Sequence, residues 1–215
     1  MGLEFIDHFN DWAHTYDKTV VGLDKEYKAV FQNYENILHE VAEHSEGTVL
    51  EFGPGTGNLT KQLLSKGHDV YAVEPSIKMM EKAKEKLPDQ VFYKGDFLNF
   101  PDFDKPIHTI VSTYAFHHLT DAEKDQALAK YSRLLPEGGK IVFADTMFED
   151  EVKKQEILND AKKNQFYHLL EDLKTEYYPL KKTMAKLFSK NGFQVSFKQL
   201  NDFVWLMVAK KRHLE

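Results

Sequence analysis

The stretch VLEFGPGTGNLTKQLL, residues 49–64, decides the fold, because it joins a short apolar strand to a helix through a glycine-rich turn. The strand ends near Glu51, and the turn carries Gly53, Gly55 and Gly57. Gly53 and Gly55 permit backbone angles, and a close approach of a ligand, that a side chain would block. A dinucleotide-binding loop has the spacing G-x-G-x-x-G, whereas Asn58 stands here in place of the third glycine. The pattern therefore predicts either a ligand-binding loop of another class or a tight strand-to-helix turn.

Short apolar runs recur along the chain, with room for a helix between most of them. They are TVLEF (48–52), DVYAVE (69–74), VFYK (91–94), HTIVSTY (108–114) and KIVFADT (140–146). This alternation is typical of a parallel sheet covered by helices. Two further runs, FQVSFKQ (193–199) and FVWLMVAKK (203–211), are joined by a short polar connection, which predicts an antiparallel hairpin. We expect an α/β fold in which parallel strands are followed by a closing hairpin.

The helices carry their own periodicity and capping signals. Apolar residues at intervals of three and four over residues 23–45 predict an amphipathic helix, which follows a helical cap. Ser76 can cap the helix that begins after it, and Thr120 with Glu123 forms a capping box for a helix over 121–134. Residues 149–178 have few β-branched residues and no turn cluster, which predicts two helices that form an inserted lid. A final helix is expected over 180–190.

Acidic residues follow two of the predicted strands. Glu74, with Pro75 after it, lies about 20 residues beyond the glycine turn, where an acidic side chain accepts hydrogen bonds from the ribose of an adenosine ligand. Asp96 follows the third strand, where it could accept from an adenine amino group while Phe97 lies against the purine. Each has a simpler interpretation, since Glu74 could be an exposed strand end and Asp96 a turn cap. Three strand ends that supply glycine, acid and acid at one sheet edge favour a shared ligand site.

The motif EFGPGTG, together with Glu74 and Gly95-Asp96, resembles class I methyltransferases that use S-adenosylmethionine (SAM), and the resemblance runs from about residue 9 to 211. The segments FNDWAHTYD, STYAFHHLTD and NDFVW are similar to those of the YrrT family of methyltransferases. The resemblance implies a Rossmann-like sheet of seven strands in the order 3-2-1-4-5-7-6, with the last strand antiparallel. Within one domain, 1–215, we expect a helical cap (1–46), a SAM-binding half (47–148), a helical lid (149–179), and a C-terminal helix and hairpin (180–213).

The same resemblance implies roles for individual residues. Gly53 and Gly55 would approach the methionine part of SAM, and Ser112 would offer its backbone to the methionine amino group. Tyr16, beside Asp17, would close over the methionine end. The residues expected to bind SAM are Glu51, Gly53, Gly55, Gly57, Glu74, Pro75, Asp96, Phe97, Ser112, Tyr16 and His117.

Methyl transfer from a sulfonium is an in-line displacement, so the protein mainly aligns the acceptor and excludes water. If the acceptor atom begins protonated, a base near neutral pKa helps, and histidine is suited to that role. His117, after the fourth strand, is the first candidate for contact with cofactor or acceptor, and Tyr16 is the second. His117 and His118 could instead hydrogen-bond backbone carbonyls. No H-E-x-x-H motif or regular His/Asp cluster occurs, so no bound metal is expected.

Composition limits the class of partner. The net charge is −6, and the lysines are interspersed with glutamates on helix faces, so long nucleic acid is a poor candidate for the substrate. No run approaches the roughly 20 apolar residues of a membrane span, and cysteine is absent, which fits a reducing compartment. We expect a cytoplasmic monomer or homodimer that acts on a small-molecule methyl acceptor.

Two other functions stay open at this point. A protein could bind SAM or S-adenosylhomocysteine without turnover, because every cofactor residue could be present without a catalytic base. A nicotinamide-dependent oxidoreductase is the third possibility, and Asn58 in the glycine loop weakens it.

Overall fold

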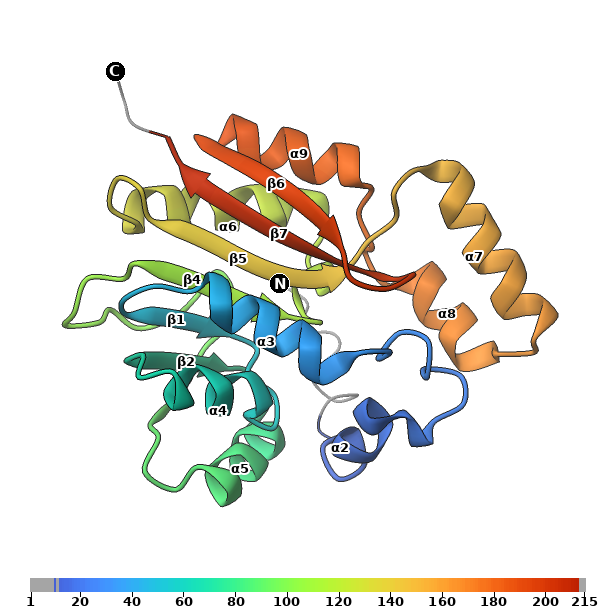
Figure 1. Cartoon of the computed structure of the whole chain (residues 1–215), viewed down its shortest axis with the longest axis horizontal. Coiled ribbons are helices and arrows are strands. Elements are labelled where there is room, and N and C mark those ends of the chain that lie inside the picture. The colour runs from blue at the N-terminus through green and yellow to red at the C-terminus, as the bar shows by residue number, and fades with distance from the viewer. Residues whose placement is uncertain (1–9, 11, 213–215) are drawn as a thin grey trace.

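The computed structural model describes residue 10 and residues 12–212, and Figure 1 shows a twisted sheet with helices packed around it. Residues 1–9 and Asp11 of the expected cap, which include two positions of the FNDWAHTYD segment, lie outside the described residues. The strands are β1 (Val49–Phe52), β2 (Val70–Glu74), β3 (Phe92–Lys94), β4 (Thr109–Thr113), β5 (Lys140–Thr146), β6 (Phe193–Gln199) and β7 (Val204–Lys211).

The sheet has seven strands in the order β3-β2-β1-β4-β5-β7-β6. Strands β1 to β5 pair in parallel, and β7 runs antiparallel to both β5 and β6. The predicted α/β fold, strand order and closing hairpin are therefore confirmed. Because the parallel strands end at one edge, the residues that follow β1, β2, β3 and β4 are brought together there.

The helices agree with the sequence-based expectations at most positions. The π-helix η2 (Thr19–Leu23) follows α2 (Tyr16–Lys18), and the 3-10 helix η3 (Phe116–His118) follows β4. Ser76 caps α5 (Ile77–Lys86), and the Thr120–Glu123 capping box opens α6 (Asp121–Leu134). The segment expected to form a lid contains the two predicted helices, α7 (Glu151–Lys163) and α8 (Tyr167–Thr175). The remaining helices are α3 (Tyr34–His44), α4 (Asn58–Ser65) and α9 (Lys181–Lys190).

The helix expected over residues 23–45 is wrong in its first half. Residues 25–33 form turns, and α3 begins only at Tyr34. Asn33, which precedes α3, has a left-handed backbone with φ of 63°, a conformation that asparagine tolerates better than most residues and that interrupts a right-handed helix. The apolar stripe of this segment is real, but its first part packs as turns between the sheet and the lid.

Alternation along the strands divides the core between the two faces of the sheet. In β1, Val49 joins the cluster with α3 and α4, whereas Leu50 and Phe52 join the cluster with α6 and α9. Glu51 has the same parity as Val49, so its side chain lies on the α4 side, where it accepts a hydrogen bond from the Thr60 hydroxyl at 2.6 Å. No helix in the described part of the chain has the length and apolarity needed to span a bilayer.

Glu51 is a buried acid whose ionisation costs free energy. Burial, together with the nearby Glu74 carboxyl, raises the pKa of Glu51 to about 8, although the Thr60 hydroxyl opposes the shift. Since the folded-state pKa exceeds the unfolded one, this residue's stabilising contribution is complete below about pH 4.5 and is lost as the pH rises toward 8.

We therefore expect Glu51→Gln to remove part of the pH dependence of stability. Between pH 5 and pH 7 the free energy of unfolding of the variant should rise relative to wild type by about 1.4 kcal/mol per pH unit. Urea unfolding of both proteins at the two pH values measures this difference. A difference that does not change with pH would show that Glu51 ionises normally in the folded protein.

Candidate functional site

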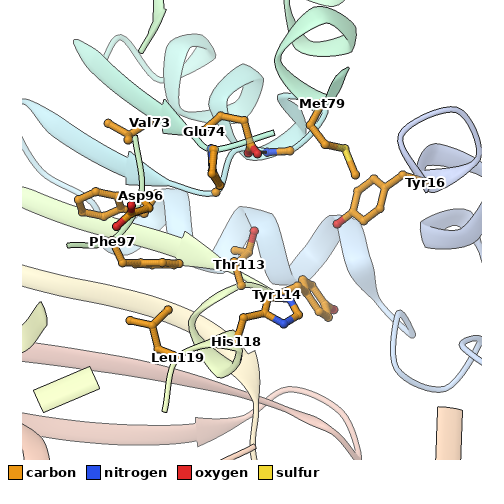
Figure 2. A pocket seen from close by; sticks show the side chains of 15 residues that line it. Tyr16, Val73, Glu74, Met79, Asp96, Phe97, Thr113, Tyr114, His118 and Leu119 are labelled. Atoms are coloured by element: carbon orange, nitrogen blue, oxygen red, sulfur yellow. Dashed lines mark hydrogen bonds between the residues drawn. The ribbon is translucent and has the colours of Figure 1, made fainter. Parts of the chain in front are cut away.

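A cavity with about 690 Å³ of space free of protein atoms lies at the carboxyl edge of the parallel strands (Figure 2). We call it the first cavity. Asp96 and Phe97 lie at one side of the first cavity, and Tyr16 extends into the cavity from the opposite side, where the cap lies. The described residues that line the first cavity are Tyr16, Phe52, Gly53, Gly55, Val73, Glu74, Pro75, Met79, Asp96, Phe97, Thr113, Tyr114, Ala115, His118 and Leu119.

Glu74 ties the glycine loop to the end of β2. Its Oε2 accepts the Gly55 N–H at 3.0 Å, and its Oε1 accepts the Ser76 N–H at 2.8 Å. Burial raises the pKa of Glu74 to about 7, even though these two N–H donors favour the carboxylate. Gly55 has φ of 55°, and the place where a Cβ would stand has no atom within 4 Å, so the loop backbone faces open space. Each Glu74 oxygen keeps a second lone pair for a ligand hydroxyl.

Asp96 both caps a turn and lines the first cavity. Its Oδ1 accepts the backbone N–H groups of Leu98 and Asn99 at 2.8 and 2.9 Å. The turn-cap interpretation of Asp96 is therefore correct, and it is compatible with ligand binding, because the second carboxylate oxygen retains acceptor capacity toward the cavity. The ring of Phe97 packs against Phe52 with ring centroids 5.3 Å apart, which fixes an aromatic wall beside the Asp96 carboxylate.

Four residues predicted to bind the cofactor do not line the first cavity. Glu51 points toward α4, because strand alternation puts its side chain on that face. Gly57 is needed for its φ of 84° and for packing, since a Cβ there would lie 3.2 Å from Leu87 and 3.3 Å from Ala83. Ser112 is buried in β4 and its hydroxyl has no hydrogen-bond partner among the described residues; Thr113, one position later, lines the cavity instead.

His117, the fourth of these residues, lies one layer deeper than expected. Its Nδ1 is 2.5 Å from Asp145 Oδ1 and its backbone N–H donates to Asp145 Oδ2, so the ring is held away from the first cavity. His118, its neighbour in η3, lines the first cavity in its place. The sequence motif therefore identified the correct segment. Which of the two histidines lines the first cavity depends on Asp145, at the end of β5, because Asp145 binds His117.

The cap docks on the glycine loop through Asp17. The Thr56 hydroxyl donates to Asp17 Oδ1 at 2.7 Å, Asn58 Nδ2 donates to the same oxygen at 3.2 Å, and Lys86 Nζ lies 2.7 Å from Oδ2. Partial burial opposes ionisation of Asp17, but these contacts outweigh it and lower its pKa. Asn58 therefore has a specific task where a dinucleotide loop has glycine: it anchors the segment that carries Tyr16.

A second cavity, with about 510 Å³ of space free of protein atoms, adjoins the first between the cap and the lid. Tyr16, Tyr114 and His118 line both cavities, so these three side chains lie at the boundary between them. The described residues that line the second cavity are Trp12, Tyr16, Tyr27, Val30, Phe31, Tyr114, His117, His118, Thr146, Asp172, Glu176 and Tyr178.

Contacts between cap and lid close the second cavity. Glu26, in the cap, accepts the backbone N–H groups of His168 and Leu169 at the start of α8. The Tyr27 hydroxyl donates to Asp172, one helical turn farther along α8. Anionic side chains are favourable at a helix N-terminus, so Glu26 is well placed to hold the lid against the cap.

A buried charge network connects the lid to the sheet. Glu176 Oε2 lies 3.4 Å from His117 Nε2, and Glu176 Oε1 lies 3.6 Å from His118 Nδ1. Burial opposes protonation of His117, but the carboxylates of Asp145 and Glu176 outweigh it and raise its pKa to about 9. Burial likewise opposes ionisation of Glu176, yet His117, His118 and the Tyr178 hydroxyl lower its pKa to about 2. The network therefore favours the imidazolium form of His117, whose ring lies between Asp145 and Glu176.

The same network contains atoms that could bind a metal. One atom each of His117, His118 and Glu176 lies within 4.8 Å of the others. A metal requires neutral imidazole, whereas His117 is held as an imidazolium, so metal binding would have to displace its proton. The expectation that no metal is bound stays a prediction.

Several residues of this site were not anticipated from the sequence. Asp145, Asp172 and Glu176 carry no local motif. Only the folded lid brings Glu176 to the two histidines and Asp172 to the wall of the second cavity. Tyr114 carries one signal visible only in the structure: its backbone is left-handed, with φ of 53°. A non-glycine residue in this conformation is strained, and such strain clusters at functional sites.

Comparisons with known proteins agree with this geometry. A family model described as a methyltransferase domain matches residues 49–139. A protein of Oceanobacillus iheyensis named "uncharacterized methyltransferase" is 55% identical over 211 residues, which cover 98% of this chain and 99% of that protein. A protein of the same description from a Geobacillus species is 55% identical over 213 residues, covering 99% of this chain and 100% of the relative.

A solved structure shares the fold. Magnesium protoporphyrin IX methyltransferase from Synechocystis, with bound S-adenosylhomocysteine, matches with a TM-score of 0.74 over 98% of this chain and 100% of that chain, at 15% identity. At this level of identity the likeness concerns the fold alone.

We expect Asp17→Asn to loosen the cap without unfolding the protein. The variant loses the ion pair with Lys86 and weakens the bonds from Thr56 and Asn58, so amide hydrogen exchange in residues 16–23 and 55–58 should quicken by about tenfold. Asp69→Asn is the matched control, because it breaks a surface pair with Lys105 at the far edge of the sheet. Equal exchange in the cap of wild type and Asp17→Asn would show that Asp17 does not hold it.

Proposed function

The chain belongs to the family of bacterial methyltransferases that these relatives represent, and we propose that it transfers the methyl group of SAM to a small molecule. The segments FNDWAHTYD, STYAFHHLTD and NDFVW support placing it in the YrrT family. One observation carries the proposal: the glycine loop, Glu74 and Asp96 line one cavity, and that cavity adjoins a second one through shared side chains. The arrangement gives a cofactor and an acceptor separate places with one meeting point.

The first cavity fits SAM in the chemistry of its donors and acceptors. The Glu74 carboxylate is positioned to accept the ribose hydroxyls, and Asp96 with Phe97 to receive the adenine amino group and ring. The open space at Gly55 leaves the loop backbone accessible to the methionine part. Asn58 also favours SAM over a dinucleotide. In a dinucleotide-binding loop a third glycine at this position allows close packing of helix and strand, whereas the Asn58 side chain here binds Asp17 and Tyr34 of the cap.

When bound, SAM would supply a methyl group on a positively charged sulfur, and the residues of this chain would align and shield it. Tyr16 closes the first cavity from the cap side, with Asp17 fixing the position of its backbone. His118 lies where the two cavities meet, so it replaces His117 as the residue proposed to contact the acceptor. His117 we assign to positioning, because its ring bridges Asp145 and Glu176.

The proposed acceptor is small because the second cavity is closed by its own chain. The Glu26 contacts to α8 and the Tyr27–Asp172 bond bring cap and lid together over the cavity. The chain's net charge of −6 also disfavours long nucleic acid as the acceptor.

The assignment of adenine to Asp96 predicts a specific change in ligand preference. Asp96→Asn keeps an oxygen for the Leu98 and Asn99 N–H groups but replaces the second oxygen with a donor. Affinity for S-adenosylhomocysteine should fall about tenfold, the effect of one lost hydrogen bond, while affinity for the inosine analogue, which presents an oxygen there, should not fall. Calorimetry measures both. Equal losses for the two ligands would remove Asp96 from adenine recognition.

Turnover distinguishes an enzyme from a protein that only senses SAM. Purified protein incubated with SAM and the small-molecule fraction of a bacterial extract should release S-adenosylhomocysteine, whereas the macromolecular fraction of the same extract should not support release. Binding of SAM without release in any fraction would favour the sensor. Release with the macromolecular fraction alone would contradict the small-molecule acceptor.

A further inference from the structure

The second cavity has an uneven distribution of charge. Asp172 and Glu176 supply carboxylates to its wall, and none of the described residues that line it is lysine or arginine. Two histidines also line it: the imidazolium of His117 is held between Asp145 and Glu176, and His118 Nδ1 lies 3.6 Å from Glu176. Because Asp145 balances that imidazolium, the carboxylates of the lid leave the cavity with an excess of negative charge. An anionic acceptor would therefore be repelled here, and a cationic one attracted.

Aromatic rings form most of the remaining wall. Trp12 and Tyr16 meet edge to face with ring centroids 5.1 Å apart, and Phe31 lies 6.3 Å from Tyr16 and 4.9 Å from Tyr114. On the lid side, Tyr178 stacks on His117 at 4.6 Å. The faces of such rings attract cations, most strongly where water is excluded. Rings and carboxylates around one space form a cage suited to an ammonium group on an apolar body.

We propose that the second cavity binds a small amine of net positive charge, primary or secondary, and that its nitrogen accepts the methyl group. The inference rests on the proposed methyltransferase function and adds the class of acceptor to it. Asp172 and the aromatic wall hold the ammonium. His118, which lines both cavities, receives its proton, with Glu176 3.6 Å from its Nδ1.

The chemistry balances with the groups present. The ammonium gives one proton to the neutral imidazole of His118, and the Glu176 carboxylate beside it stabilises the imidazolium that forms. This transfer frees the nitrogen lone pair. That lone pair forms the new nitrogen–carbon bond while the carbon–sulfur bond of the donor breaks, and its electrons stay on sulfur as a neutral thioether. The positive charge passes from sulfur to the methylated nitrogen, which the carboxylate-lined cavity stabilises. The proton taken by His118 then leaves to solvent.

Separation of the acceptor pool by charge tests the proposal. A small-molecule extract of bacterial cells is passed over a cation exchanger at pH 7, and the retained and unretained fractions are each incubated with SAM and the full-length protein. We expect release of S-adenosylhomocysteine to be at least about tenfold faster with the retained fraction. Treating that fraction with acetic anhydride in bicarbonate, which converts amines to neutral amides, should abolish it.

Activity confined to the unretained fraction, or activity that survives acetylation, would overturn the amine acceptor and leave methyl transfer standing. Failure of every fraction to support release would instead contradict the proposed function itself. The two failures are therefore distinguishable within one experiment.

Asp172→Asn gives a second readout at the proposed ammonium site. The variant keeps an oxygen for the Tyr27 hydroxyl but removes the charge, so the amount of retained fraction needed for half-maximal rate should rise about tenfold, with affinity for S-adenosylhomocysteine unchanged. Glu171→Gln is the matched control, since it removes the same charge from an exposed position on the same helix. Equal effects of the two variants, or a weaker affinity for SAM alone, would show that Asp172 does not serve the acceptor.

Discussion

The site depends on the Glu74 carboxylate and the two backbone N–H groups that it accepts. Through Gly55 and Ser76 this side chain joins the loop after β1 to the end of β2 and the start of α5, so the glycine loop has one position rather than several. Burial raises the pKa of Glu74 to about 7, which means that the carboxylate is held at a cost in free energy. A ligand that donates hydroxyls to it would offset that cost. These two hydrogen bonds tie the loop to β2 and leave acceptor capacity on Glu74, which the proposed ribose contact would use.

Everything on the cap side is built on that fixed loop. Asp17 docks on Thr56, Asn58 and Lys86, and this contact fixes the start of α2 and with it Tyr16. The lid completes the enclosure from the other side, where Glu26 and Tyr27 of the cap meet α8. The result is a pair of cavities that share Tyr16, Tyr114 and His118, with the cofactor chemistry on the sheet side and the acidic, aromatic wall on the lid side. Enclosure by the cap and the lid would suit an in-line methyl transfer, which needs water kept from the reacting atoms.

The sequence predicts those features whose causes are local. The glycine loop, Glu74 and Asp96 follow predicted strands, and the carboxyl ends of parallel strands meet at one edge, so their assembly in the first cavity could be expected. Strand alternation could also have predicted the position of Glu51. Its side chain lies on the same face of β1 as that of Val49 and therefore faces α4. The break at Asn33 could not be expected, since the apolar stripe of a helix continues through it and only its left-handed backbone interrupts the helix. The exchange of roles between His117 and His118, and the contributions of Asp172 and Glu176, depend on how the lid folds over β5, which no spacing in the chain encodes.

Calorimetric titration of the purified protein with S-adenosylhomocysteine, and in parallel with NAD, tests the central claim most directly. The account predicts micromolar binding of S-adenosylhomocysteine and no comparable binding of NAD, because Glu74, Asp96 and the open loop at Gly55 suit an adenosine with a single amino-acid tail. No binding of S-adenosylhomocysteine, or preferential binding of NAD, would mean that the glycine loop does not hold SAM and would contradict the account.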